Sequence, residues 1–239
     1  MLNPMMPTWC YCGPRRLRIQ GGFTLIELLI TISIIAVLAG MLIPTVGLVK
    51  TMAYGSRCSS QQRQIFMATQ SYCTDQEGLL PNNDNHASYG GWSWLLRVGT
   101  YLYPEIGEAS IRNIVYKTKS VMACPAALQA HADKADPNNV SGYASYAQND
   151  YVDSGLLPTF AQIKLPAEVM LNIDAGWASS SNYWNGSAVY NNSGQVPESP
   201  HRGSTVVTYA DGHVEKSTRA SLPLTDISSS AGKRWWKGQ

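Results

Sequence analysis

Residues Gly22-Phe23-Thr24-Leu25-Ile26-Glu27 open an apolar stretch that continues to Val49. Glu27 is the one charged residue in this stretch, and the next charge along the chain is Lys50. As a helix, the residues from Phe23 to Val49 would be about 40 Å long, which exceeds the roughly 30 Å hydrocarbon core of a bilayer. The stretch therefore predicts a membrane-spanning helix that carries a single carboxylate near its start.

The segment before this stretch is basic and ends in two small residues. Arg15, Arg16 and Arg18 are its charged residues, and it closes with Gly21-Gly22. A secretory signal peptide has an apolar region of about 7–15 residues with its cleavage site after that region. Here the small residues precede the apolar run, so a cut after Gly22 would leave the helix on the mature chain.

Glu27 requires an explanation, because a carboxylate at the centre of a membrane helix costs about 2.5–3.5 kcal/mol on translocon scales. The basic leader, the Gly22-Phe23 junction and Glu27 together resemble the N-terminus of type IV prepilins and type II secretion pseudopilins. The resemblance implies that prepilin peptidase cuts after Gly22 and methylates the amino group of Phe23. It also implies that Glu27 pairs with the N-terminal amine of a neighbouring subunit, and that Pro44 bends the helix.

The same resemblance implies a location. The leader arginines would remain on the cytoplasmic side of the bacterial inner membrane, with a single membrane pass and the C-terminal domain outside. Lys50, Arg57 and Arg63 flank the other end of the apolar stretch, so the cleavage motif decides the topology better than the charge bias does. The expected partners are prepilin peptidase, other pilin or pseudopilin subunits and inner-membrane lipid.

Charge and composition exclude a nucleic-acid-binding surface. The chain has 18 basic and 16 acidic residues, and removing the three leader arginines leaves 15 against 16, a charge of −1. A near-neutral surface is poorly suited to phosphate binding. The low charged fraction of 14% suits a loop-rich β domain outside the cytoplasm.

The residues after the membrane segment predict a second helical part. From Leu48 to about Glu77 the chain is expected to form an amphipathic helix that ends at Gly78 and Pro81. Its buried face is predicted to hold Met52, Cys58, Ile65, Thr69 and Tyr72, with Arg57, Gln61, Arg63 and Gln64 mostly elsewhere. We expect an α+β, type IV pilin-like fold in which this long N-terminal helix packs on a small antiparallel β domain.

The predicted domains follow from these segments. They are a cleaved leader at 1–22, a transmembrane and assembly helix at 23–49, an amphipathic helix at 50–80, a β-rich extracytoplasmic domain at 81–227 and a flexible tail at 228–239. Within the β-rich domain, residues 92–102 predict a short helix or strand, and residues 120–126 and 168–174 predict strands.

The strongest β signal is a hairpin. The sequences of residues 204–210 and 213–216 are typical of two β-strands. Asp211-Gly212 joins them, and this pair favours a two-residue turn with positive φ at both positions. His201 precedes Asp211 by nine intervening residues. This spacing resembles that of a prepilin-associated domain, which is named for a His followed by nine residues and Asp-Gly. Other residues of this chain also follow the order found in that domain: Cys58, Tyr72, Leu80-Pro81, Cys124-Pro125, Ser145-Tyr146, Asn149 and Asp174.

The roles expected for His201, Asp211 and Gly212 are structural. Asp211 and Gly212 would form the turn, and His201 would enter the strand through hydrogen bonds. Seven or more strand residues separate His201 from Asp211 by over about 20 Å, which disfavours a shared metal ion. No cofactor is expected; calcium held by Asp150, Asp153 and Asp174 is the alternative.

Three cysteines remain after loss of the leader, which contains Cys10 and Cys12. Cys58 and Cys73 lie on one predicted helix about 22 Å apart and cannot pair. Buried thiols are the favoured interpretation, and a bridge from Cys124 to one of the other two is the alternative.

The sequence predicts a structural subunit of a type II secretion or type IV pilus-like filament, and no enzyme. Its four histidines occur outside His-Glu-x-x-His motifs, and no P-loop or Gly-x-Ser-x-Gly segment is present. A membrane-tethered module that binds polysaccharide is the main alternative, with an aromatic loop containing Trp177, Tyr183, Trp184 and Tyr190 as its binding surface. An anchored hydrolase is the third hypothesis.

Overall fold

The computed structural model describes residues 23–81, 93–107, 110–111, 120–130, 145–153, 159–174, 177–178, 183–184, 187–188, 200–223 and 228–238. The leader at 1–22 lies outside these residues. The chain divides into two compact units, Met1–Val46 and Gly47–Gln239, which are described separately below. Helix α1 (Leu25–Asp75) crosses the boundary between them.

In the first unit, α1 is an apolar helix that presents its side chains to the outside. Among the described residues, it is the one helix long and apolar enough to cross a membrane, with a mean hydropathy of 2.6 over 18 residues and none of that window buried. Its hydroxyl groups are satisfied locally: Thr31, Ser33 and Thr45 each donate to the carbonyl three residues earlier, at 2.7–2.8 Å. These bonds remove the cost of exposing an unpaired polar group to lipid.

In the second unit, α1 is amphipathic, as predicted. Its buried face contains Gly55, Cys58, Gln61, Gln62, Ile65, Phe66, Ala68, Thr69 and Cys73. Two assignments from the sequence were wrong, because Met52 is 68% exposed and Gln61 is buried. The helix ends two residues earlier than predicted, where Glu77 and Gly78 have positive φ and the Gly78 N–H donates to the Cys73 carbonyl at 2.7 Å.

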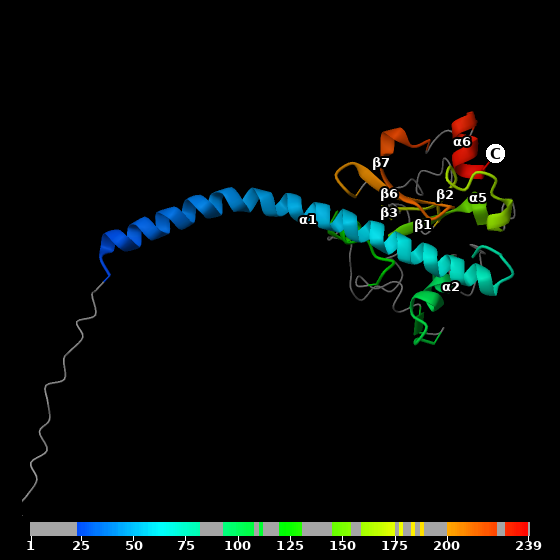
Figure 1. The fold of residues 1–239 in the computed structure, drawn as a ribbon, viewed down its shortest axis with the longest axis horizontal. Helices are drawn as coiled ribbons and strands as arrows, with labels where there is room; N and C mark the ends of the chain where they lie inside the picture. The colour runs from blue at the N-terminus through cyan, green and yellow to red at the C-terminus, as the bar shows by residue number, and fades with distance from the viewer. Residues whose placement is uncertain are drawn as a thin grey trace, which may run out of the picture. The chain divides into compact units, whose positions relative to one another are not determined.

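A five-stranded sheet with the order β5-β1-β2-β6-β7 forms the centre of the second unit (Figure 1). Its four antiparallel strands are β1 (Tyr146–Asn149), β2 (Met170–Asp174), β6 (Ser204–Tyr209) and β7 (Val214–Thr218). The edge strand β5 (Ser187–Ala188) pairs parallel to β1, and β3 (Trp177–Ala178) pairs with β4 (Tyr183–Trp184) as a separate ribbon. A long apolar N-terminal helix followed by this small sheet confirms the predicted α+β, type IV pilin-like arrangement.

Both faces of the sheet are covered. Val206 packs in the cluster that contains Ile65 and Cys58 of α1, whereas Val207 packs against Trp235 and Trp236 on the opposite face. Neighbouring residues of β6 are therefore both buried, although the strand contains Thr205 and Thr208 as well as apolar residues. Burial on both faces agrees with the lack of a regular apolar-polar alternation in the sequence of this strand.

The remaining short helices differ in part from the sequence expectations. Helix α2 (Ser93–Leu102) decides between the two predicted alternatives for that segment. The strand predicted at 120–126 was wrong: Ser120–Met122 form a turn and Pro125 begins α4 (Pro125–Ala130), because proline suits the first position of a helix. The described residues also contain three single-turn helices: α5 (Asp150–Asp153), η1 (Phe160–Gln162) and η2 (Arg219–Ser221).

The end of the chain is a packed helix, so the prediction of a flexible tail was wrong. Helix α6 (Ser230–Lys237) is capped by Ser229, whose hydroxyl accepts from the Gly232 N–H at 3.0 Å. Trp235 and Trp236 are 5% and 0% exposed. Aromatic side chains of this size dominate the energy of a core, so they hold this basic segment on the sheet.

Candidate functional site

The N-terminal segment is organised by a reciprocal cap between Thr24 and Glu27. The Glu27 carboxylate accepts from the Thr24 backbone N–H at 2.9 Å and from the Thr24 hydroxyl at 2.7 Å. In return, the Glu27 N–H donates to the Thr24 hydroxyl oxygen at 3.3 Å. This Thr-x-x-Glu arrangement is a capping box, which satisfies backbone donors that a helix N-terminus leaves free. The sequence interpretation gave Glu27 no such local role.

The residues around this cap are apolar and exposed. Phe23 is 78% exposed and Leu25 is 82% exposed. Gly22 lies outside the described residues, so the structure starts at the residue after the predicted cut.

Pro44 lies inside α1 and has no N–H to donate to Gly40, but the helix continues through it. The bend expected at Pro44 stays a prediction.

A second set of sequence-predicted residues meets in the interior of the second unit. We call it the buried cluster, and it consists of Cys58, Cys124, Asp174 and His201. Cys58 on α1 forms a disulfide with Cys124, with their Cα atoms 5.4 Å apart. The preference for buried thiols was therefore wrong for this pair, whereas Cys73 is a buried free thiol.

His201 connects the disulfide to the sheet. Its Nε2 atom lies 3.5 Å from Cys124 Sγ and 3.5 Å from an Asp174 carboxylate oxygen. That oxygen also accepts from the Val206 N–H at 2.7 Å and from the Thr205 hydroxyl at 3.3 Å. Asp174 thereby joins the end of β2 to the start of β6.

Burial controls the protonation of both side chains. Burial raises the pKa of Asp174 to about 8, against hydrogen bonds from Val206 and Thr205 and the charge of Lys216. Burial, with the Lys216 charge, lowers the pKa of His201 to about 4. Near neutral pH the pair therefore holds one proton between its facing atoms.

A glycine on α1 gives this cluster its space. A Cβ atom on Gly55 would lie 3.3 Å from Lys216 Nζ and 3.8 Å from His201 Nδ1. The absence of that atom allows the ammonium group and the imidazole to approach the helix backbone closely. The sequence alone predicted no role for Gly55 in packing.

Strand β6 begins and ends in two different turns. At its start, the backbone N–H groups of His201 and Ser204 each donate to the other residue's carbonyl at 3.2 Å, and the residues between them have positive φ, 57° and 84°. This is a two-residue turn of the type expected for hairpins. It places the His201 side chain toward Asp174 and away from Asp211.

At the end of β6 the turn differs from the prediction. The Gly212 N–H donates to the Tyr209 carbonyl at 2.9 Å and the Tyr209 N–H donates to the His213 carbonyl at 3.0 Å. Gly212 has φ 91°, but Asp211 has no positive φ. The connection is therefore a three-residue loop with a glycine bulge, and the two-residue turn was wrong.

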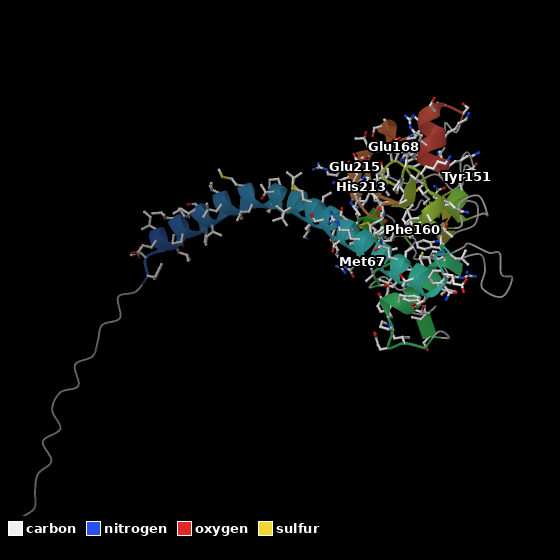
Figure 2. The ribbon with its side chains drawn as sticks, turned by 45° about the vertical axis from the view of Figure 1, so that its right-hand side comes forward. Met67, Tyr151, Phe160, Glu168, His213 and Glu215 are labelled. Atoms are coloured by element: carbon white, nitrogen blue, oxygen red, sulfur yellow. A yellow bond between two sulfur atoms is a disulfide. The ribbon has the colours of Figure 1, made fainter. Side chains whose placement is uncertain are left out.

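Asp211 acts within this loop on its neighbour. Its carboxylate accepts from the His213 N–H at 3.0 Å and lies 2.6 Å from His213 Nδ1. His213 and Glu215 are exposed residues at the start of the β7 arm (Figure 2). His201 and Asp211 thus lie at opposite ends of β6 with different partners, as the strand-length argument required.

Two buried glutamines were missed as structural residues. Gln61 donates to the carbonyls of Ser120 and Ala123 at 3.3 and 3.2 Å, and accepts from the Tyr146 hydroxyl at 2.9 Å. Gln62 accepts from the Thr208 hydroxyl at 2.6 Å. They lie three and four residues after Cys58, so spacing alone predicts that they face inward, whatever their polarity.

Other candidates from the sequence lie at the margin of the described residues. Asp150 and Asp153 are in α5, but the positions of their side chains are not among those described. The same holds for the side chains of Trp177, Tyr183 and Trp184, and Tyr190 lies outside the described residues altogether. The calcium and polysaccharide hypotheses therefore stay predictions.

Comparison with known proteins identifies the N-terminal segment. Residues 17–43 match the family described as the prokaryotic N-terminal methylation motif. No curated protein matches the chain. No solved structure matches it either. The match covers the leader arginine at position 18, the Gly22-Phe23 junction and the capped start of α1, and it ends just before Pro44.

Proposed function

We propose that this chain is the precursor of a structural subunit of a type II secretion or type IV pilus-like filament of bacteria, and that it is not an enzyme. One observation carries the proposal: the methylation motif at 17–43 overlaps the start of a helix whose apolar side chains are exposed. A soluble protein would bury such a surface. A filament subunit uses it twice, first in the inner membrane and then against its neighbours.

Processing follows from the position of the motif. Prepilin peptidase is the expected partner, with the scissile bond between Gly22 and Phe23 and methylation of the new amino terminus. The cut would leave Thr24 as the second residue of the mature chain, so the capping box would stand at the membrane-spanning helix's extreme N-terminus. Negative charge at that position is favoured by the helix dipole.

Assembly uses the same carboxylate. Within a helix bundle of low dielectric, a carboxylate attracts an amine strongly, and either group is penalised when unpaired. Because the Glu27 side chain is already fixed by Thr24, it is preorganised to receive the amine of a neighbouring subunit. The local cap and the pairing between subunits are compatible, since a carboxylate accepts several hydrogen bonds.

The second unit suits a position outside the cytoplasm. Disulfides form and persist in oxidising compartments, and the Cys58–Cys124 bridge ties α1 to the turn before α4. This supports a topology with the N-terminus in the cytoplasm and the sheet on the far side of the inner membrane.

The proposal is tested by the assembly state of the chain in cells that contain a prepilin peptidase and an assembly system. After chemical crosslinking, a filament subunit gives a ladder of multimers in the sheared surface fraction. A chain that is cleaved after Gly22 but stays monomeric in the membrane would contradict the proposal and favour the tethered binding module.

A further inference from the structure

We propose that the buried cluster binds a Zn²⁺ ion in place of its disulfide when Cys58 and Cys124 are reduced. The cluster contains the residue types of a closed zinc site: two thiolates, one imidazole and one carboxylate. This site goes beyond the role in filaments proposed above and does not depend on it. It also differs from the expectation, drawn from the sequence, that no metal is bound at His201.

The positions of the ligand atoms support this site. The two Sγ atoms and a ring nitrogen of His201 lie within 4.8 Å of one another. The His201 Nε2 atom is 3.5 Å from Cys124 Sγ and 3.5 Å from the Asp174 oxygen. With Zn–S near 2.3 Å and Zn–N and Zn–O near 2.0–2.2 Å, the nitrogen–sulfur and nitrogen–oxygen edges of a tetrahedral site are about 3.4–3.6 Å long, and the sulfur–sulfur edge is about 3.8 Å. The distances from His201 to Cys124 and to Asp174 already match, whereas the two Sγ atoms must move apart once the disulfide bond is broken.

The chemistry of the ligands selects the metal. Thiolate sulfur and imidazole nitrogen favour Zn²⁺, whereas Ca²⁺ and Mg²⁺ prefer oxygen ligands. Cys58, Cys124 and His201 already lie together, and Asp174 beside His201 would move toward the ion as the fourth ligand of a closed, structural site. Cys58, Cys124 and Asp174 are each 0% exposed, and His201 is 1% exposed.

The surroundings also suit a charged complex. Two thiolates, one carboxylate and Zn²⁺ sum to a charge of −1. Lys216 brings a positive charge that acts on both Asp174 and His201. Within the described part of the chain, Asp174 Oδ1 and His201 Nδ1 are buried without a hydrogen-bond partner. These two atoms are not the ones that would bind the ion, because His201 Nε2 and the Asp174 oxygen beside it face the disulfide side of the cluster.

The ligands come from four separate segments: α1, the turn before α4, the end of β2 and the turn before β6. The ion would tie the same segments as the disulfide, together with two strands. The pattern lacks the short Cys-x-x-Cys spacing of common zinc motifs, which is why the sequence does not reveal it.

Opening the site is a balanced two-electron step. A phosphine reductant supplies two electrons that break the Cys58–Cys124 bond, and it takes the oxygen of water to become a phosphine oxide. The two protons of that water end on the two thiols. Zn²⁺ then displaces both thiol protons to solvent as the Zn–S bonds form.

The experiment uses the full-length protein in detergent micelles, reduced with a phosphine and titrated with Co²⁺ and with Zn²⁺. We expect one Co²⁺ per chain with a thiolate-to-cobalt charge-transfer band, displacement of Co²⁺ by Zn²⁺, and no such band for the oxidised chain. If reduction unfolds the chain, Zn²⁺ should restore its circular dichroism. A reduced chain that binds less than a stoichiometric amount, or that stays unfolded with Zn²⁺, would overturn the proposal.

Variants assign the ligands. Cys124→Ser and His201→Ala should each weaken Co²⁺ binding by more than the roughly 10–100-fold typical of changes to residues that only hydrogen-bond to a metal ligand. Cys73→Ser is the matched control, because Cys73 is a buried thiol outside the cluster whose pKa is raised to about 11 by burial. Unchanged binding in His201→Ala, or lost binding in Cys73→Ser, would contradict the assignment.

Discussion

The Glu27 carboxylate receives two hydrogen bonds from Thr24, one from its backbone N–H at 2.9 Å and one from its hydroxyl at 2.7 Å. A charged residue in a helix that is long and apolar enough to cross a membrane thus has a local structural function in addition to any function between subunits. The two functions need different chemistry. Capping requires only a hydrogen-bond acceptor, whereas pairing with an amine requires a charge.

Glu27→Gln separates these functions. Glutamine also serves at the third position of a capping box, so membrane insertion and helix content should stay unchanged. Filament yield should fall by about tenfold or more, because removing one partner of a buried ion pair costs about 3–5 kcal/mol. Alkaline extraction measures insertion, and the sheared fraction measures assembly.

Glu27→Val provides the comparison. It removes both functions and also the cost of a charge in the membrane, so insertion should stay the same or improve while assembly falls. A normal filament yield for Glu27→Gln, together with a defect in Glu27→Val, would show that capping is the whole role of this residue.

Gly212→Val should destabilise the second unit more than Gly203→Val does. Both glycines have positive φ, 91° and 84°, so each substitution carries a backbone cost of about 1–3 kcal/mol. A Cβ on Gly212 would also collide with the ring of Phe66 on α1, whereas one on Gly203 would meet nothing within 4 Å. Overpacking adds about 1–3 kcal/mol to the first variant. Equal melting temperatures for the two variants would exclude close packing of this loop on α1.

Trp236→Ala should destabilise the second unit by about 3–5 kcal/mol, the usual cost of removing a buried aromatic side chain. Trp236 is 0% exposed and its ring N–H donates to the Pro223 carbonyl at 2.9 Å. Lys233→Ala on the exposed side of α6 is the control and should change stability by less than about 0.5 kcal/mol. Thermal melts of both variants in detergent decide between a packed helix and a flexible tail.

The stability of the disulfide-bonded chain should fall as pH rises from about 6.5 to about 8. In this window the folded pair of Asp174 and His201 keeps one proton, because burial raises the pKa of Asp174 to about 8. In the unfolded chain Asp174 is ionised above about 4 and His201 loses its proton above about 6.5. The folded state therefore binds more protons, and stability declines with pH. Between about pH 4 and pH 6.5 the folded pair carries one proton on Asp174, since the pKa of His201 is lowered to about 4. The unfolded chain also carries one proton, on His201, so stability should change little with pH in this range.

Melting temperatures measured across this pH range in the presence of a chelator test this expectation. Asp174→Asn should lose the slope, since an amide does not titrate but still accepts from the Val206 N–H. A slope that persists in Asp174→Asn would assign the proton to another group.

The sequence predicted the parts of this protein that depend on local pattern. The long apolar stretch with Glu27 as its one charge predicted the helix that is long and apolar enough to cross a membrane, and residues 168–174 predicted the strand that the structure has at Met170–Asp174. Asp211-Gly212 correctly marked a hairpin, but this pair suits both a two-residue turn and a three-residue loop with a glycine bulge. The close approach of Phe66 to Gly212 is a tertiary contact that no local pattern contains. The prediction of a flexible tail was wrong because the order of this segment also depends on tertiary packing. Residues 233–237 include three charged side chains, but the burial of Trp235 and Trp236 on the sheet outweighs the tendency of those charges to stay in solvent.

The buried cluster could be predicted only in part. The order of Cys58, Cys124, Asp174 and His201 along the chain suggested a known domain but not that the four residues meet. Their contact depends on the order of the strands, which places the end of β2 beside the start of β6. The Cys58–Cys124 pairing also depends on tertiary packing, because the two residues are 66 positions apart.

The central claim is that this chain is a prepilin-type precursor, and the mass of its N-terminal peptide tests it most directly. The protein is expressed in a bacterium with a prepilin peptidase, purified from the membrane and digested, with Gly22→Val as the uncleaved control. We expect a mature chain of 217 residues that begins with N-methylated Phe23, and an intact leader in Gly22→Val. A mature protein that retains residues 1–22, or one cut after the apolar helix near residue 45, would contradict it.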